Sequence, residues 1–457
     1  ALLEAAWPGK FVEESNLAVQ IAALRKALGT QQSGQEWIVT VPRLGYRLPI
    51  AAIPVAGDAA GGTRRPMLAV LPFEDLSPDR DQEYLADGLV EDITTALSHF
   101  RTLAVVSRNS AHAYKGRTLD VRQVGKELGV RYLLEGAIRA QPDRVRLNVQ
   151  LVETETGTQL WSRRFDGPRT ALFETQDQIT QGVVAAIQPN ITRAEVERAR
   201  RRLTSNPTAY DLYLRALPHL FFREGRGATD LLEEALRLDP DFYLAAAYAG
   251  QQHLSNFFVQ AAGDTNADRD RGQELLNKVL PHCGEDATLL SLCAGMFMNL
   301  EQFDQALELA LRAVTENPND AFALGTAGVM SLFCGELQAA ADYQLRALSL
   351  SPNEYFAQAQ LACVSHIRLC EGRPEEAIEW ALRSLAASPH WPPSYWLLAA
   401  ANAHLGRIEE ARRYVGELLK INPSLTVSKL RVSLRARDPS RVEVVIQGLR
   451  LGGLPEN

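Results

Sequence analysis

Prolines recur at a fixed spacing in the carboxyl-terminal half of this 457-residue chain. Pro318 and Pro352 are 34 residues apart, and the same spacing separates Pro389 from Pro423. An alanine lies twelve residues before each of these prolines, at Ala306, Ala340, Ala377 and Ala411. Small residues let two helices approach closely, and proline ends the second helix before the next pair begins. The spacing therefore predicts stacked helix pairs.

A second small position supports this reading. The residues five places before the four prolines are Ala313, Ala347, Ser384 and Leu418. An earlier unit keeps the same offsets with Ala228, Ala235 and Pro240. The pattern resembles tetratricopeptide repeats. Residues 206–457 are thus expected to form an α-solenoid of five clear repeats and a degenerate one at 241–281, with a capping helix pair at 425–455. The resemblance implies a protein or peptide partner on the solenoid.

Composition restricts the remaining possibilities. The chain is 46% hydrophobic and 23% charged, with a net charge of −7, so any surface that binds nucleic acid must be local. The longest apolar candidate for a membrane segment, LPIAAIPVAG at 48–57, is too short for a bilayer span and contains two prolines. Residues 51–66 read as a flexible linker. The five cysteines form no CxxC pair and read as packing residues.

The middle region, residues 67–168, alternates between strand and helix patterns. MLAVLPF at 67–73 is a continuous apolar run typical of a buried strand. Helices are expected at 83–98 and 121–128, the second ending at Gly129. A short strand is expected at 103–106 and three longer ones at 132–139, 144–153 and 159–165. RVRLNVQLVE at 144–153 alternates charged or polar with apolar residues, as in a sheet with one solvent-exposed face.

Specific stretches of this region match a known domain. They include LAVLPFEDLSPD at 68–79, YLADGLVEDITTAL at 84–97 and ELGVRYLLEGAIR at 127–139. The region resembles the amino-terminal α/β domain of TolB, in the version found in bacterial proteins between an output domain and tetratricopeptide repeats. That resemblance implies an output domain that is either a winged-helix DNA-binding domain or a nucleotide cyclase. Residues 169–205 are expected to form a connecting helix.

The first fifty residues carry a helix pattern followed by a hairpin pattern. SNLAVQIAALRKALG at 15–29 places Leu17, Ile21, Leu24 and Leu28 on one apolar stripe. WIVTVPRLGYRL at 37–48 reads as two short strands joined by a turn at 42–45. This order resembles the recognition helix and wing of OmpR-type response regulators and their CadC-like relatives. The resemblance implies a partial winged-helix domain over residues 1–50.

By that likeness the helix enters the major groove and the wing approaches phosphates or the minor groove. The expected DNA-binding residues are Asn16, Gln20, Arg25, Lys26, Arg43 and Arg47. Gln20 could make an amide contact to a base edge. The alternative for Arg25 and Lys26 is a solvated helix face, and the wing arginines fit either role. Five basic and four acidic residues within 1–50 make a weak phosphate-binding surface.

No catalytic constellation, cofactor motif or metal-ligand spacing stands out, so we expect a protein that is not an enzyme. The expected fold class is multidomain α/β plus all-α: a partial winged helix, a small mixed α/β domain and an α-solenoid. The expected function is a bacterial cytoplasmic transcriptional regulator that binds promoter DNA, senses a signal or partner, and has no membrane contact. RNA polymerase is a candidate partner, and a homodimer a candidate state. The alternative is a non-enzymatic interaction scaffold with a truncated, inactive winged helix.

Overall fold

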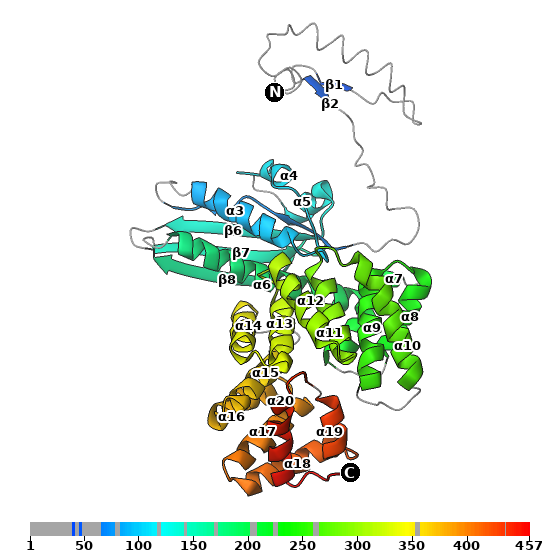
Figure 1. Cartoon of the computed structure of the whole chain (residues 1–457). Helices are drawn as coiled ribbons and strands as arrows, with labels where there is room; N and C mark the ends of the chain where they lie inside the picture. Colours follow the sequence, from blue (N-terminus) through cyan, green and yellow to red (C-terminus); the bar gives the residue numbers. More distant parts are fainter. Residues whose placement is uncertain are drawn as a thin grey trace. The chain divides into compact units, whose positions relative to one another are not determined.

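The computed structural model divides into two compact units, Ala1–Gly62 and Thr63–Asn457. It describes residues 39–41, 45–47, 65–77, 83–116, 120–140, 144–168, 172–201, 208–222, 227–258, 265–351, 357–434 and 436–457. In the first unit, two strands are described. In the second unit, a mixed sheet with its helices is followed by a helical solenoid, which confirms the expected multidomain α/β plus all-α class (Figure 1).

The sheet of the second unit has the strand order β5-β3-β6-β7-β8. The strand β3 (Met67–Val70) lies between β5 (Ala104–Val105) and β6 (Tyr132–Ala140) and runs parallel to both. The strands β6, β7 (Arg144–Glu153) and β8 (Thr158–Pro168) form an antiparallel meander. A short strand, β4 (Glu74–Asp75), also pairs with β6. Parallel and antiparallel pairing therefore meet at β6.

Helices cover the two faces of this sheet unequally. Leu68, Leu134 and Leu147 face the side on which α3 (Glu83–Ser98) and α6 (Leu172–Arg201) pack. The opposite face is covered at Ala69 and Leu133 by the short helix α5 (Val121–Leu128). Because successive strand residues point to opposite faces, one apolar run can serve both layers. On this same face, away from α5, the strands β6, β7 and β8 carry polar side chains.

The sequence-based elements of this region are largely confirmed. The helices at 83–98 and 121–128 have the expected bounds, and Gly129 ends α5 in the left-handed conformation with φ 67°. The strand β4 and the short helix α4 (Arg108–His112) were not expected. The alternation in β7 holds up to Gln150, where a register shift between Leu151 and Val152 leaves both side chains buried.

Helix α6 is more than a connection between domains. Ile179, Val183 and Ile187 belong to the core beneath the sheet. Further along the helix, Val196 and Ala199 belong to the core of the solenoid. The helix α6, which lies within the connecting helix expected at 169–205, thus contributes buried side chains to both parts.

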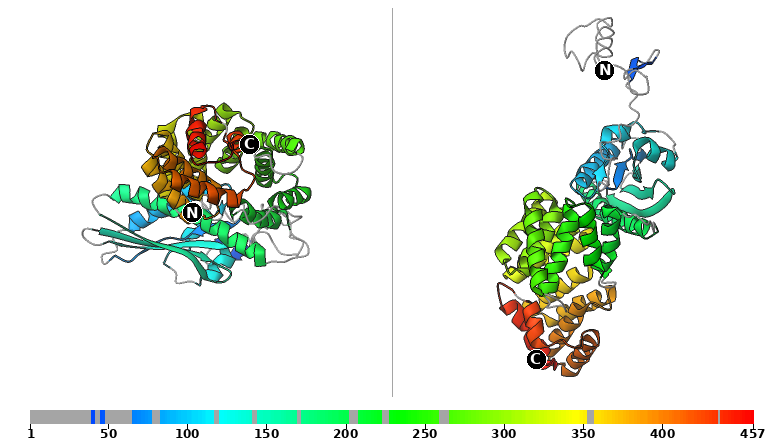
Figure 2. Two further views of the ribbon diagram at one scale, coloured as in Figure 1. Left: turned by 90° about the horizontal axis from the view of Figure 1, so that it is seen from below. Right: turned by 90° about the vertical axis from the view of Figure 1, so that its right-hand side faces the viewer.

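Helices α7 to α18 form six consecutive pairs within the described residues, and α19 and α20 follow them (Figures 1 and 2). This agrees with the six expected repeats and their cap. The bounds are α7 Ala209–Phe222, α8 Ala228–Leu238, α9 Tyr243–Phe258, α10 Thr265–Val279, α11 Ala287–Asn299, α12 Phe303–Glu316, α13 Ala321–Cys334, α14 Leu337–Leu350, α15 Ala357–Cys370, α16 Pro374–Ala387, α17 Pro392–His404, α18 Ile408–Ile421, α19 Val427–Ser433 and α20 Ser440–Leu451, with a 3-10 turn at Leu280–His282.

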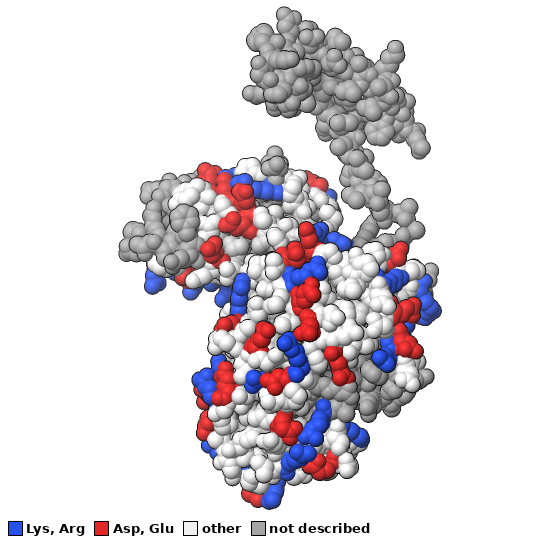
Figure 3. All heavy atoms as spheres, in the orientation of Figure 1, with Lys and Arg blue, Asp and Glu red and all other residues white. Residues whose placement is uncertain are grey.

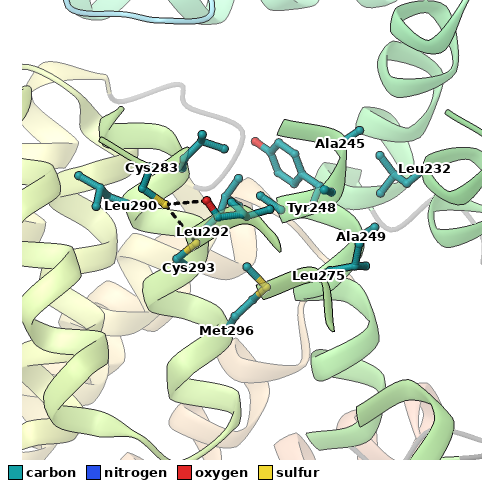
Figure 4. Packing of buried hydrophobic residues seen from close by; sticks show 14 of the residues in the cluster. Leu232, Ala245, Tyr248, Ala249, Leu275, Cys283, Leu290, Leu292, Cys293 and Met296 are labelled. Carbon is teal, nitrogen blue, oxygen red and sulfur yellow. Dashed lines mark hydrogen bonds between the residues drawn. The ribbon is translucent and has the colours of Figure 1, made fainter. Parts of the chain in front are cut away.

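The small residues of the repeat pattern are buried as predicted. Their exposure is 0% at Ala306, Ala340, Ala377 and Ala411. Ser384 occupies an alanine position, and its hydroxyl donates a hydrogen bond to the Gln358 carbonyl at 2.7 Å. Figure 4 shows part of the core around α9 and α11, where the buried thiols of Cys283 and Cys293 lie 3.5 Å apart among leucine and alanine side chains.

The cap packs against the last repeat through direct backbone contact. A Cβ atom at Gly448 of α20 would lie 2.5 Å from the Ala400 Cα and 2.8 Å from its carbonyl oxygen. These distances leave no room for a side chain. Gly416, on the exposed side of α18, has no such neighbour within 4 Å.

We predict that Gly448→Ala destabilises the chain even though alanine favours helix by about 1 kcal/mol over glycine. The overpacking against Ala400 should outweigh that gain, for a net loss of about 1–3 kcal/mol. The control Gly416→Ala should be neutral or stabilising. Urea unfolding of both variants provides the measurement, and equal stabilities would contradict the predicted contact.

A charged cluster joins the first two repeats. The ring of His253 lies between two carboxylates, with Nδ1 2.6 Å from Asp268 Oδ1 and Nε2 3.1 Å from Glu233 Oε1. The Arg271 guanidinium donates to both oxygens of Glu233 at 2.9 and 2.8 Å. Burial lowers the pKa of His253, but its two carboxylate partners outweigh burial and raise it. Hydrogen bonds from His253 and Arg271 lower the pKa of Glu233 to about 2.

These shifts predict a pH-dependent contribution to stability. Because the pKa of His253 is higher in the folded chain than in the unfolded chain, its protonation stabilises the fold at a pH below the unfolded-state pKa. This stabilisation is lost as the pH rises through the folded-state pKa. His253→Gln should therefore cost about 1–3 kcal/mol near pH 6 and less near pH 9. Urea unfolding at both pH values, with the exposed His390→Gln as control, tests this. A loss independent of pH would show that His253 acts through packing alone.

Candidate functional site

The described part of the first unit is the predicted wing. Strands β1 (Val39–Val41) and β2 (Gly45–Arg47) pair antiparallel, with Val39 opposite Arg47 and Val41 opposite Gly45. The two short strands expected at 37–48 are therefore present. Arg47 ends the second of them. Arg43 lies between the strands and outside the described residues.

The remaining expected DNA contacts also lie outside the described residues. They are Asn16, Gln20, Arg25 and Lys26, all within the helix expected at 15–29. Their assignment to DNA stays a prediction from the sequence.

Within the described residues, the second unit carries a concave candidate site on the solenoid. It has a volume of about 320 Å³ and is formed mainly by the first helices of successive pairs, α9, α11, α13 and α15. We call this site the solenoid groove. Tyr248, Met298 and Phe322 supply part of its apolar surface. Its polar lining includes Gln251, Gln252, Ser255, Thr326, Gln344 and Gln360.

Two helical glycines make room for the amide side chains of the solenoid groove. A Cβ atom at Gly295 would lie 2.8 Å from the amide nitrogen of Gln251. At Gly325 it would lie 2.9 Å from the amide nitrogen of Gln360. Glycine inside a helix costs about 1 kcal/mol relative to alanine, so its presence here calls for a packing reason. Close approach of the glutamines is that reason.

The amides of Gln344 and Gln360 are anchored from one side only. Gln344 donates to the Gly325 carbonyl at 2.9 Å, and Gln360 donates to the Ala321 carbonyl at 3.2 Å. The side-chain oxygen of each is buried, with no hydrogen-bond partner among the described residues. A buried acceptor without a donor costs about 1–3 kcal/mol. Both oxygens are out of reach of solvent, so a ligand N–H group could bond to them only after the amides turn toward the groove.

No Asp, Glu, Lys, Arg or His is found among the described residues that line the solenoid groove. On the face of the molecule drawn in Figure 3, acidic and basic side chains are interspersed over the solenoid. The groove can therefore offer hydrogen bonds and apolar contacts, but it offers a ligand no opposite charge. The repeat pattern did not identify these glutamines, because they occur at irregular offsets from the prolines. The helical glycines were the available signal.

The described residues also contain no candidate metal site, no disulfide bond and no membrane-spanning helix. There, no three His, Cys, Asp or Glu side chains cluster in a way that could hold a metal ion. None of the five cysteines forms a disulfide bond. None of the described helices has the length and hydropathy needed to cross a membrane.

Comparison with known protein families identifies three parts of the chain. Residues 1–48 match the carboxyl-terminal domain of transcriptional regulatory proteins. Residues 63–182 match the second domain of HilA/YgeH-like transcriptional regulators. Residues 392–425 match a tetratricopeptide repeat. The chain therefore carries transcriptional-regulator domains together with tetratricopeptide repeats.

Among curated proteins, the chain is similar to putative adenylate cyclase 3 of Rhizobium meliloti (strain 1021). The two are 36% identical over 248 residues, which is 53% of this chain and 42% of the relative. The chain thus spans less than half the length of that protein.

Solved structures with similar parts include two further proteins. The type IV pilus biogenesis factor PilW has a TM-score of 0.36 and 17% identity, and the match covers 50% of this chain and 100% of PilW. TolB from Acinetobacter baumannii has a TM-score of 0.22 and 19% identity, over 30% of each chain.

Proposed function

We propose that this chain, which carries the domains of a transcriptional regulator, binds promoter DNA through residues 1–48. The observation that carries the proposal is the family match over this segment. The antiparallel pairing of β1 and β2 at the expected wing supports it. The α/β domain and the solenoid then serve to sense a signal or bind a partner.

The proposed contacts follow the chemistry of DNA. Arg43 and Arg47 on the wing would neutralise phosphates, and Gln20 would present its amide to a base edge. With a net charge of −7 on the whole chain, DNA affinity has to come from this local surface. A regulator of this kind acts in the bacterial cytoplasm, where RNA polymerase is a candidate partner.

The solenoid groove is the proposed site for a protein partner. Its amide-rich, uncharged lining suits an extended segment with uncharged side chains, recognised partly through its backbone. Backbone groups of the segment would bond to the partly exposed amides of Gln251 and Gln252, which line the same groove. Tyr248, Met298 and Phe322 would contact apolar side chains of the same segment.

We further propose that the chain acts by binding rather than by catalysis. The relative named as a putative adenylate cyclase is matched over only 42% of its length, so its activity is not transferred to this chain. The family matches within the chain are to regulator domains and a repeat. Turnover of ATP by the purified chain would overturn this part of the proposal.

A second candidate function is an interaction scaffold without DNA binding. It is favoured by the near balance of five basic and four acidic residues within 1–50, which is unfavourable for phosphate contacts. The solenoid groove would then carry the whole function. The two candidates differ in whether the chain shows salt-dependent affinity for DNA.

The double variant Arg43→Ala with Arg47→Ala tests DNA binding. We expect it to weaken binding of the full chain to a mixed-sequence DNA duplex at least about tenfold near physiological salt. The dependence of the logarithm of affinity on the logarithm of salt should fall by about two, one for each lost phosphate contact. Fluorescence anisotropy of labelled duplex across a salt series provides the measurement.

The matched control is Arg412→Ala with Arg413→Ala, which removes two exposed arginines from α18. This variant should bind DNA as the wild type does. Equal effects of the two double variants, or no salt-dependent binding by the wild type, would favour the scaffold.

The solenoid groove can be tested with an array of synthetic peptides graded in net charge and apolar content. We expect the labelled full chain to prefer uncharged peptides. Thr326→Arg places a charged side chain in the groove and should weaken those signals at least about tenfold, because an unpaired charge is costly in an apolar contact. Thr315→Arg, at an exposed position on α12, is the control. Preference for charged peptides would exclude the proposed recognition.

A further inference from the structure

The strand β8 (Thr158–Pro168) is the last strand of the sheet on its side, as Figure 1 shows. It pairs with β7 along one edge, and α6 packs over part of one face. Within the described residues no strand pairs with its other edge. At 11 residues it is long for an edge strand, and unpaired backbone groups on such an edge are a template for another strand.

The part of β8 that could accept a partner is limited at both ends. The register shift against β7 skips Leu160, since Leu151 pairs with Trp161 and Val152 pairs with Gln159. Beyond this irregularity, pairing with β7 is continuous from Trp161 to Pro168. Pro168 lacks a backbone N–H and ends the usable edge. The regular edge therefore has its middle close to Arg164 and Phe165.

Opposite charges stand two residues apart on this regular edge. Arg164 and Asp166 lie on the same face of the sheet because side chains alternate along a strand. Their side chains form an ion pair at 3.0 Å, and Arg164 remains 62% exposed. Asp166 also accepts a hydrogen bond from Arg146 of β7 at 2.7 Å. Because the Arg164 side chain is exposed to solvent, it can also bind a carboxylate of another molecule.

We infer that β8 pairs antiparallel with β8 of a second copy of this chain, in a two-fold arrangement centred on Phe165. In this register Arg164 of each copy lies directly opposite Asp166 of the other. Because the arrangement has two-fold symmetry, the pair of Arg164 and Asp166 forms at two places in the contact. Backbone hydrogen bonds along the joined edges provide the remaining affinity.

Charge selects this register from its neighbours. A contact centred on Arg164 places the two Arg164 side chains opposite each other, and one centred on Arg163 does the same for Arg163. Like charges directly opposite each other destabilise a strand pair, whereas opposite charges stabilise it. Centring on Phe165 instead places Arg163 opposite Gly167 and Ser162 opposite Pro168. Of these three registers, the one centred on Phe165 places an arginine opposite an aspartate, and it does so at two symmetry-related positions.

The competing explanation is that the same charges keep the edge free of partners. Charged residues, a bulge and proline are common means of protecting exposed edges. Under that explanation the chain is monomeric, and reversing one charge changes nothing in its assembly. Self-association of the full chain therefore distinguishes the two, and it does so independently of whether the chain binds DNA.

Sedimentation velocity over a concentration series of the wild type, Arg164→Asp and Asp166→Arg tests the inference. The wild type should form dimers, and each single variant should dissociate at a concentration at least tenfold higher. An equimolar mixture of the two variants should recover dimerisation, because every opposed pair across the mixed contact is again of opposite charge. Circular dichroism checks that both variants are folded.

Arg412→Asp, on the exposed surface of α18, is the control and should dimerise as the wild type does. A wild type that stays monomeric at every concentration overturns the inference. So does a dimer that neither reversal weakens, because its contact must then lie elsewhere. A mixture of variants that fails to recover dimerisation rejects the register centred on Phe165.

Discussion

A buried carboxylate on α6 holds the second unit together where the sheet meets the solenoid. Glu195 is 3% exposed, and it accepts hydrogen bonds from the Tyr132 hydroxyl at 2.6 Å and from the Arg131 guanidinium. A buried charge that loses its partner costs about 3–5 kcal/mol. Helix α6 therefore cannot leave the sheet without exposing or orphaning this group. Because Val196 and Ala199 on the same helix belong to the solenoid core, the sheet and the repeats share this constraint.

Close packing on small residues governs the rest of the solenoid. Fully buried alanines bring paired helices together, and Gly448 brings the cap into backbone contact with α17. The same device has a second consequence at Gly295 and Gly325. There the missing side chains make room for glutamines, and the concave surface becomes polar without becoming charged. Helix packing and the proposed recognition in the solenoid groove therefore both depend on small residues.

Much of the fold could be predicted because its signals are local or periodic. The two helices beside the sheet follow from apolar residues three or four apart, and the solenoid follows from recurring small residues and prolines. The strand β4 and the helix α4 were missed because each has too few residues for a period to appear. The shift between Leu151 and Val152 was missed because alternation along one strand carries no record of its neighbour's register. The solenoid groove could not be predicted from the sequence, because its glutamines do not recur at a fixed position of the repeat.

The sequence by itself predicted the succession of domains and the number of repeats, and it determined the positions of their small residues. It also provided the candidate DNA contacts, including Arg43 and Arg47, because a wing and its helix are contiguous stretches with local patterns. Only the tertiary structure decided that α6 is shared between two cores, that Gln344 and Gln360 meet in one groove, and that β8 ends the sheet. The physical reason is that these features join residues far apart in the chain. A local or periodic pattern does not record which distant residues will be buried together.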